Sequence, residues 1–174
     1  MSKPTPIDEE IPLDPKRYIV SETDEKGKIT FCNDYFMEVS GYTKEELIGK
    51  AHNIVRHPDM PRVVFKLLWE TISAGKNINA LVKNLAKDGR YYWIFTEFEI
   101  RTDTDTGKII GYHAARKSIS KHVIEIISDL YKELLEIEKT DSVDAAQIYL
   151  VNFLKEKGDD MEFSNIMEEI HRFY

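Results

Sequence analysis

Residues 78–117 read INALVKNLAKDGRYYWIFTEFEIRTDTDTGKIIGYHAARK, and this stretch decides the fold. Three segments within it, 78–86, 90–101 and 108–117, are rich in the apolar and aromatic residues that strands favour. The turns Lys87-Asp-Gly89 and Thr102-Asp-Thr-Asp-Thr-Gly107 separate them, and turns of this composition join antiparallel strands. The stretch therefore predicts three consecutive strands of one antiparallel sheet.

The preceding segments predict two more strands and three helices. Residues 17–31 alternate around Asp24-Glu-Lys-Gly27, a strand–turn–strand pattern, and helical spacing follows over 33–39. Thr43-Lys-Glu-Glu46 is a capping box that begins a second helix. A third runs from a candidate N-cap, Asp59, to Gly75, and its expected buried face consists of Val64, Phe65, Leu68, Trp69 and Ile72. The predicted order is β-β-α-α-α-β-β-β, an α+β domain.

Both ends of the chain differ from this domain. Residues 1–16 hold four of the six prolines and predict an extended leader. The tail, residues 121–174, predicts three helices, the last two from about Val143 to Lys157 and from about Met161 onward, its apolar face including Ile170 and Phe173. The first helix has an a/d-like apolar seam formed by Val123, Ile127, Leu130, Leu134 and Ile137. This seam either packs on the domain or pairs with another helix.

The overall composition excludes several classes of protein. A net charge of −7 and a pI near 5.3 argue against nucleic-acid binding, which needs a basic surface. No apolar run approaches the roughly 20 residues of a membrane span. The first ten residues have no apolar core after a basic start, so we expect no secretory signal, and the single Cys32 is typical of a reducing compartment. We therefore expect a cytoplasmic protein.

The densest polar cluster is His52-Asn-Ile-Val-Arg-His-Pro-Asp-Met-Pro61. It places Arg56 and His57 just before a predicted helix N-terminus, an arrangement that suits an anion such as a phosphate. The alternative is a surface loop in which Asp59 caps the helix and Arg56 pairs with a nearby acid. The residues alone leave both interpretations open.

This cluster and the motifs around it resemble the PAS domain of the Aer family of bacterial energy-taxis transducers. The resemblance covers about residues 17–120, and a free-standing PAS domain with a short helical tail is most similar to CetB-like proteins. The motifs that carry it are Asn33-Asp-Tyr-Phe, Ser40-Gly-Tyr-Thr-Lys-Glu-Glu-Leu-Ile-Gly49, the 52–61 cluster, Phe65, Leu68-Trp69, Val82-Lys-Asn84, Lys87-Asp-Gly89 and Tyr92-Trp93.

The resemblance implies a PAS fold, a five-stranded antiparallel sheet with helices on one face, followed by the helical tail. It also implies a sensor that binds FAD and relays its oxidation state to a membrane chemoreceptor, CetA-like or another methyl-accepting protein. A homodimer through the sheet face or the tail helix is a further expectation, as is a location at the inner face of the membrane. The residues matching the flavin site are Arg56, His57, Asp59, Trp69, Asn84 and, more weakly, Asn33.

Other interpretations start from where the chain departs from the family. Ile78 replaces a tryptophan and Leu85-Ala86 replace a basic pair, which favours a cofactor-free interaction adaptor. His113 on the last strand suggests a haem ligand instead. His52, His57 and Asp59 form an incomplete metal set, because zinc sites need three or four ligands in fixed geometry. We expect Cys32 to be a buried structural thiol, and no motif of an enzyme is visible.

Overall fold

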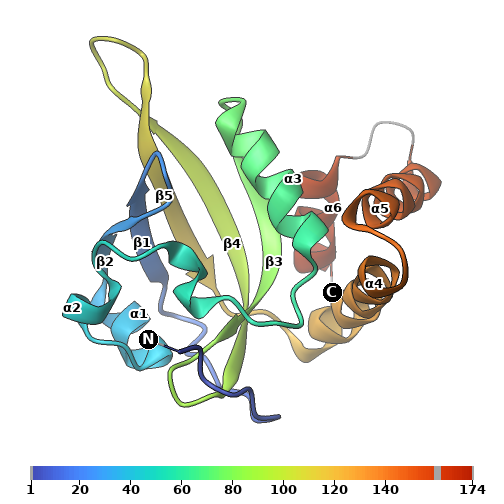
Figure 1. Cartoon of the computed structure of the whole chain (residues 1–174), viewed down its shortest axis with the longest axis horizontal. Coiled ribbons are helices and arrows are strands. Elements are labelled where there is room, and N and C mark those ends of the chain that lie inside the picture. Colours follow the sequence, from blue (N-terminus) through green and yellow to red (C-terminus); the bar gives the residue numbers. More distant parts are fainter. Residues whose placement is uncertain (1, 159–161, 174) are drawn as a thin grey trace.

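The computed structural model describes residues 2–158 and 162–173, without the side chains of residues 157, 170 and 173. The predicted order of elements is confirmed (Figure 1). The strands are β1 (Ile19–Asp24), β2 (Ile29–Cys32), β3 (Ile78–Leu85), β4 (Tyr91–Thr102) and β5 (Ile109–Lys117). The helices are α1 (Asp34–Ser40), α2 (Lys44–Leu47), the 3-10 helix η1 (His52–Val55), α3 (Arg62–Ser73), α4 (Lys121–Thr140), α5 (Val143–Lys157) and α6 (Phe163–Phe173).

The five strands form one antiparallel sheet in the order β2-β1-β5-β4-β3. The N-terminal strands β1 and β2 join the later strands β3, β4 and β5 where β1 pairs with β5, with Ser21 opposite Ala114. Side chains alternate between the two faces of a strand, so Asn84, Thr96 and Arg116 share one face. We call this the inner face, because α3 covers it (Figure 1).

Local sequence signals explain where the first helices begin and end. The Asn33 side chain accepts a hydrogen bond from the Phe36 N–H and caps α1, which ends at Gly41 in the left-handed region at φ 74°. The capping box of Thr43 and Glu46 begins α2 as predicted. The prediction that Asp59 caps α3 is wrong: Pro61 occupies the N-cap, and a carboxylate from the tail meets the first N–H groups.

The predicted buried face of α3 is only partly buried. Val64, Leu68 and Ile72 lie in the core, whereas Phe65 is half-buried and Trp69 is 40% exposed. Helical spacing groups residues on one side of a helix, but it does not tell whether the edge of that side meets the core or a cavity. Phe65 and Trp69 border the cavity described below.

The tail packs against its own domain at strand β3 (Figure 1). The seam predicted for α4 is buried, apart from the half-buried Ile137. The Tyr131 hydroxyl donates to the Leu81 carbonyl at 2.6 Å, and the Asn79 N–H donates to Ser164 Oγ at 2.8 Å. Because β3 is an edge strand, these bonds use backbone groups that would otherwise be open to another strand. The last tail helix is predicted to begin at about Met161, which lies outside the described residues. The side chains of Ile170 and Phe173, predicted for its apolar face, are also outside the described part of the chain.

The leader is tied to the turn between β3 and β4. The Ile7 N–H donates to the Gly89 carbonyl, and the Ile11 N–H donates to the Tyr91 carbonyl at 2.7 Å. Gly89 has φ 94°, and a Cβ there would clash with the Thr5 carbonyl, so only glycine lets the leader approach this closely. Within the described residues, no helix has the length and apolar character that crossing a membrane requires.

Candidate functional site

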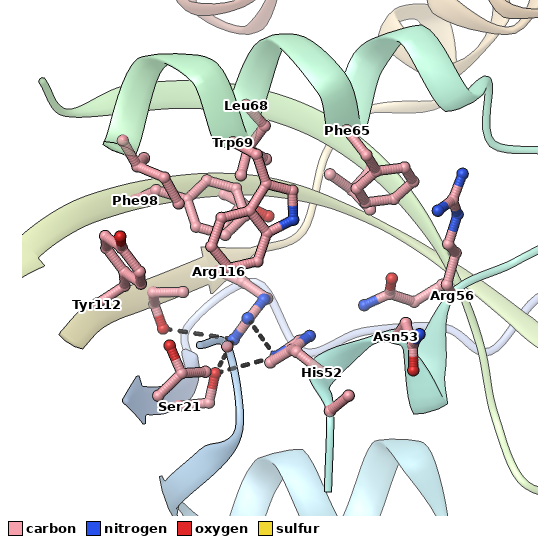
Figure 2. Close-up of a pocket in the computed structure, with 18 of the residues that line it drawn as sticks. Ser21, His52, Asn53, Arg56, Phe65, Leu68, Trp69, Phe98, Tyr112 and Arg116 are labelled. Atoms are coloured by element: carbon pink, nitrogen blue, oxygen red, sulfur yellow. Dashed lines mark hydrogen bonds between the residues drawn. The ribbon is translucent and has the colours of Figure 1, made fainter. Parts of the chain in front are cut away.

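A cavity of about 460 Å³ lies between α3 and the inner face of the sheet (Figure 2). Its size falls within the range of small-molecule sites. We call it the sheet cavity. Apolar and aromatic groups form most of its wall, notably Phe65, Leu68, Trp69, Phe98 and Tyr112. Trp69 meets Tyr112 edge to face, with ring centroids 5.7 Å apart, and Figure 2 shows both rings bordering the same space.

The floor of the sheet cavity holds a buried guanidinium. Arg116 is 2% exposed and lies on β5, where the alternation of the strand turns it toward the cavity. Its Nη1 donates to Ser21 Oγ at 3.0 Å, and its Nη2 lies 2.7 Å from His52 Nε2 (Figure 2). Among the described residues, no carboxylate forms an ion pair with it. Burial lowers the pKa of Arg116 to about 10, so the group still carries its charge at neutral pH.

His52 is neutral because it is buried next to this guanidinium. Burial, helped by the charge of Arg116, lowers the pKa of His52 to about 3. Since a guanidinium can only donate hydrogen bonds, Nε2 of His52 is the acceptor and the ring proton resides on Nδ1. The His52 ring also stacks on Phe36, with centroids 5.8 Å apart. The floor therefore combines one cation with neutral hydrogen-bonding groups.

The mouth of the sheet cavity lies between α3 and the 52–61 loop. The Arg56 guanidinium sits over the Phe65 ring, 4.0 Å from its centroid, and Figure 2 shows the two side chains beside each other. At the other side, Trp69 approaches Gly27 so closely that a Cβ there would lie 2.8 Å from the indole. Gly27 has φ 78° in the turn between β1 and β2, so the turn and the indole both require glycine.

The six residues matched to the flavin site occupy different places. Arg56, Trp69 and Asn84 line the sheet cavity. His57 is 2% exposed and accepts a hydrogen bond from the Asp59 N–H at Nδ1, and burial lowers its pKa to about 4. The exposed Asp59 carboxylate pairs with Lys83 at 3.0 Å. Asn33 caps α1 and accepts from the Val20 N–H, which joins α1 to β1 outside the cavity.

A second cavity, of about 310 Å³, lies where the 52–61 loop meets α4. We call it the tail cavity. Four cations line it, namely Lys3, Arg56, Arg62 and Lys139, together with one carboxylate, Glu138. Glu138 accepts hydrogen bonds from the Arg62 N–H at 3.0 Å and the Val63 N–H at 2.8 Å. A carboxylate at this position satisfies free N–H groups and complements the helix dipole. The tail thus supplies the cap of the helix that covers the sheet cavity.

The remaining candidates do not converge on either cavity. Alternation along β5 turns His113 to the face opposite Tyr112 and Arg116, so a haem in the sheet cavity would not meet it. His52 borders the sheet cavity and His57 the tail cavity. Within the described ranges, no group of three or more His, Cys, Asp or Glu side chains is arranged to hold a metal ion. Cys32 is buried, and desolvation raises the pKa of its thiol.

Sequence reasoning missed several residues of these cavities. Arg116, Ser21 and Thr96 line the sheet cavity from three different strands. A signal existed for Arg116, because it shares a strand face with Tyr112 and Ala114 in a segment predicted to be a strand. Glu138 gave no comparable signal, since it is one acid among many on an amphipathic helix.

Comparison with known proteins agrees with this fold. Residues 29–116 match the PAS fold family. The aerotaxis receptor of Escherichia coli K12 is 38% identical over 133 residues, which are 76% of this chain and 26% of the receptor. A blue-light photoreceptor of Listeria innocua is 28% identical over 123 residues, 70% of this chain and 47% of that protein. The chain therefore spans about a quarter of the receptor and under half of the photoreceptor.

Solved structures give the same fold. The light state of the Aureochrome1 LOV photoreceptor has a TM-score of 0.55 at 18% identity, covering 66% of this chain and 90% of that one. A PAS domain from Colwellia psychrerythraea has a TM-score of 0.51 at 24% identity, covering 60% of this chain and 87% of that one. At these identities the likeness concerns the fold. Together with the sequence matches, it shows that the chain belongs to the PAS family and that its PAS domain is of the aerotaxis-receptor type.

Proposed function

We propose that this chain is a redox or energy sensor that binds a flavin in the sheet cavity and signals through its tail. The observation that carries the proposal is Arg116, a buried cation with neutral partners on the floor of a mostly apolar cavity. Such a group favours a flat, apolar ligand with an electron-rich polar edge. Its sequence relatives include a receptor for aerotaxis and photoreceptors for blue light, which are sensory proteins by name.

A flavin fits the chemistry of the walls. Its ring system is aromatic, and Phe65, Trp69 and Tyr112 offer rings to pack against it. Its pyrimidine ring carries carbonyl oxygens, which accept hydrogen bonds from Arg116 and from the amide of Asn84. A bound flavin supplies reversible electron uptake. Arg116 would stabilise negative charge near the floor, and Asn84 would orient the ring.

FAD is the flavin that we propose. In this chain, the buried Leu85 and Ala86 stand where the family resemblance implies a basic pair, so these two positions supply no cation. Contact with the phosphates is assigned to Arg56, which lines both cavities, as does Arg62. His57, Asp59 and Asn33 would act by holding the loop and α1 in place, through the hydrogen bonds described above.

The tail is the proposed output element. Glu138 caps α3, and Tyr131 binds the backbone of β3, so two elements that line the sheet cavity are bonded to α4. A ligand-dependent shift of α3 or β3 would change how well α4 docks, which is what a two-state signal requires. The proposed receiver is a cytoplasmic portion of a membrane chemoreceptor, CetA-like or another methyl-accepting protein, with a homodimer through the sheet face or the tail as a further proposal.

The test is a visible absorption spectrum of the purified protein, before and after addition of FAD, FMN or riboflavin. A flavoprotein shows a band at roughly 450 nm, and mass spectrometry of the released ligand identifies which flavin is bound. Protein that is colourless and gains no bound flavin would overturn the proposal and favour the cofactor-free adaptor. A Soret band would identify a haem sensor instead.

A further inference from the structure

Thr96 has a hydroxyl that the protein itself does not satisfy. The residue is 0% exposed and lies on β4, the strand between β3 and β5. Among the described residues, Oγ1 of Thr96 is a buried side-chain atom that has no hydrogen-bond partner, and Thr96 is one of the residues that line the sheet cavity. A buried hydroxyl without a partner is costly, and most such groups in proteins are paired. Its position on a cavity wall indicates that a ligand supplies the partner.

The neighbours of Thr96 determine which way the hydroxyl points. Thr96 is directly opposite Arg116 across the β4–β5 pair, and both side chains lie on the inner face. Side-chain dipoles orient in the local field, so the guanidinium charge favours the hydroxyl oxygen toward Arg116 and the proton away from it. Thr96 would then donate its hydrogen bond into the cavity. Residues directly opposite one another have Cβ atoms about 4.5–5.5 Å apart, so the two donors face one ligand edge.

We infer that Thr96 is a ligand-binding residue that donates a hydrogen bond to a ring carbonyl, beside the carbonyl that Arg116 contacts. The ligand class is a planar ring with neighbouring carbonyl groups, as in the pyrimidine part of a flavin. This inference rests on the proposed function for the identity of the ring. The missing hydrogen-bond partner of the Thr96 hydroxyl is a property of the ligand-free protein, so it can be tested in the absence of any ligand.

The experiment compares Thr96→Val, which keeps the shape and removes the hydroxyl, with Thr96→Ser, which keeps the hydroxyl. Dissociation constants for riboflavin are measured by fluorescence quenching, because riboflavin has no phosphate and reports on the ring site. We expect Thr96→Val to weaken binding about 5- to 30-fold, the effect of one lost hydrogen bond of about 1–2 kcal/mol, and Thr96→Ser to stay within about 3-fold of wild type. The ligand-free Thr96→Val protein should melt at a higher temperature than wild type.

Thr71→Val is the matched control. The Thr71 hydroxyl donates to the Leu67 carbonyl at 2.7 Å within α3 and does not line the cavity, so this variant should leave riboflavin binding unchanged. Equal riboflavin affinity of wild type and Thr96→Val would overturn the inference while leaving a flavin sensor intact. A lower melting temperature of ligand-free Thr96→Val would overturn it as well. Wild type that binds neither riboflavin nor FAD would instead count against the proposed function, and the melting temperatures of wild type and Thr96→Val would still test whether the Thr96 hydroxyl lacks a partner.

Discussion

The sheet cavity and the tail cavity both contain cations, but they balance that charge differently. In the sheet cavity, Arg116 contacts Ser21, His52 and the Ala114 carbonyl, which are all neutral. In the tail cavity, Glu138 lies among four cations and accepts two backbone N–H groups. The first cavity therefore suits an external group with electron-rich atoms, whereas the second obtains its anion from within the chain. Arg56 and Arg62 line both cavities, so the two environments meet at these two side chains.

The difference teaches that, under the proposed function, ligand binding and signalling would act on different parts of one helix, α3. One side of α3 covers the sheet cavity with Phe65 and Trp69, and its first turn is capped from the tail. A sensor needs a site that the ligand changes and an element whose docking responds. Here the two share α3, so disturbing one cavity without the other is the direct way to test the comparison.

Acid should give the largest effect, because each cavity holds a histidine that is kept neutral. The pKa is lowered to about 3 for His52 and to about 4 for His57. Below the ordinary histidine pKa of about 6.5, the unfolded chain binds more protons than the folded one, so stability falls with pH. We expect the free energy of unfolding to drop by about 2–4 kcal/mol between pH 7 and pH 5, measured by urea denaturation.

Single variants separate the two contributions to this pH dependence. His52→Gln removes the titrating ring at the sheet cavity but keeps an acceptor for Arg116. His57→Gln removes the titrating ring beside the tail cavity but keeps an acceptor for the Asp59 N–H. Each should flatten the dependence between pH 7 and pH 5 by a similar amount, because both folded-state pKa values lie below pH 5. His171, whose pKa burial also lowers, is present in both variants and acts in the same direction. An unchanged slope in both would contradict the neutral state assigned to these rings.

Replacing Arg116 by methionine tests the sheet cavity alone. We expect flavin affinity to fall roughly 10- to 100-fold, because a hydrogen bond from a charged donor contributes about 1.5–3 kcal/mol. The ligand-free variant should be more stable than wild type, since a buried charge without a counterion is replaced by an apolar side chain of similar length. Titration with riboflavin and thermal melting measure the two effects. A variant that is both less stable and equally tight in binding would show that Arg116 has a structural role only.

Much of the fold was predictable from the sequence, and the reason is physical. Alternating apolar residues, the Thr43 capping box and glycines at turns are local signals, and β1 to β5 and α1 to α6 follow them. The site was less predictable. Trp69 was expected to be buried, but the packing of α3 leaves it at the cavity edge, and Asp59 was expected to cap a helix that Glu138 caps from 76 residues away in sequence. Contacts between distant residues depend on tertiary packing, which spacing does not encode.

Glu138→Gln tests the tail cavity. The substitution keeps the shape of the side chain but removes its charge and turns an amide donor toward one of the two N–H groups. We expect a loss of about 1–2 kcal/mol in the free energy of unfolding, typical of a helix cap. Hydrogen exchange of the Arg62 and Val63 amides should accelerate, while riboflavin affinity stays within about 3-fold of wild type, a difference under roughly 0.7 kcal/mol. Slow exchange of these amides in the variant would contradict the capping role.

The smallest effect is expected for Asp144→Asn, a second tail carboxylate that contacts α3. Asp144 lies 3.0 Å from Lys66 Nζ, but its side chain is 85% exposed, and Lys66 also has Gln147 at 2.7 Å. Exposed ion pairs contribute little, so the free energy of unfolding should change by about 0.5 kcal/mol or less. Asp144→Asn therefore serves as the matched control for Glu138→Gln, because both remove one negative charge at the junction of tail and α3. If the two variants were equally destabilised, net charge at the junction would explain the effect. A loss confined to Glu138→Gln would locate it in the cap.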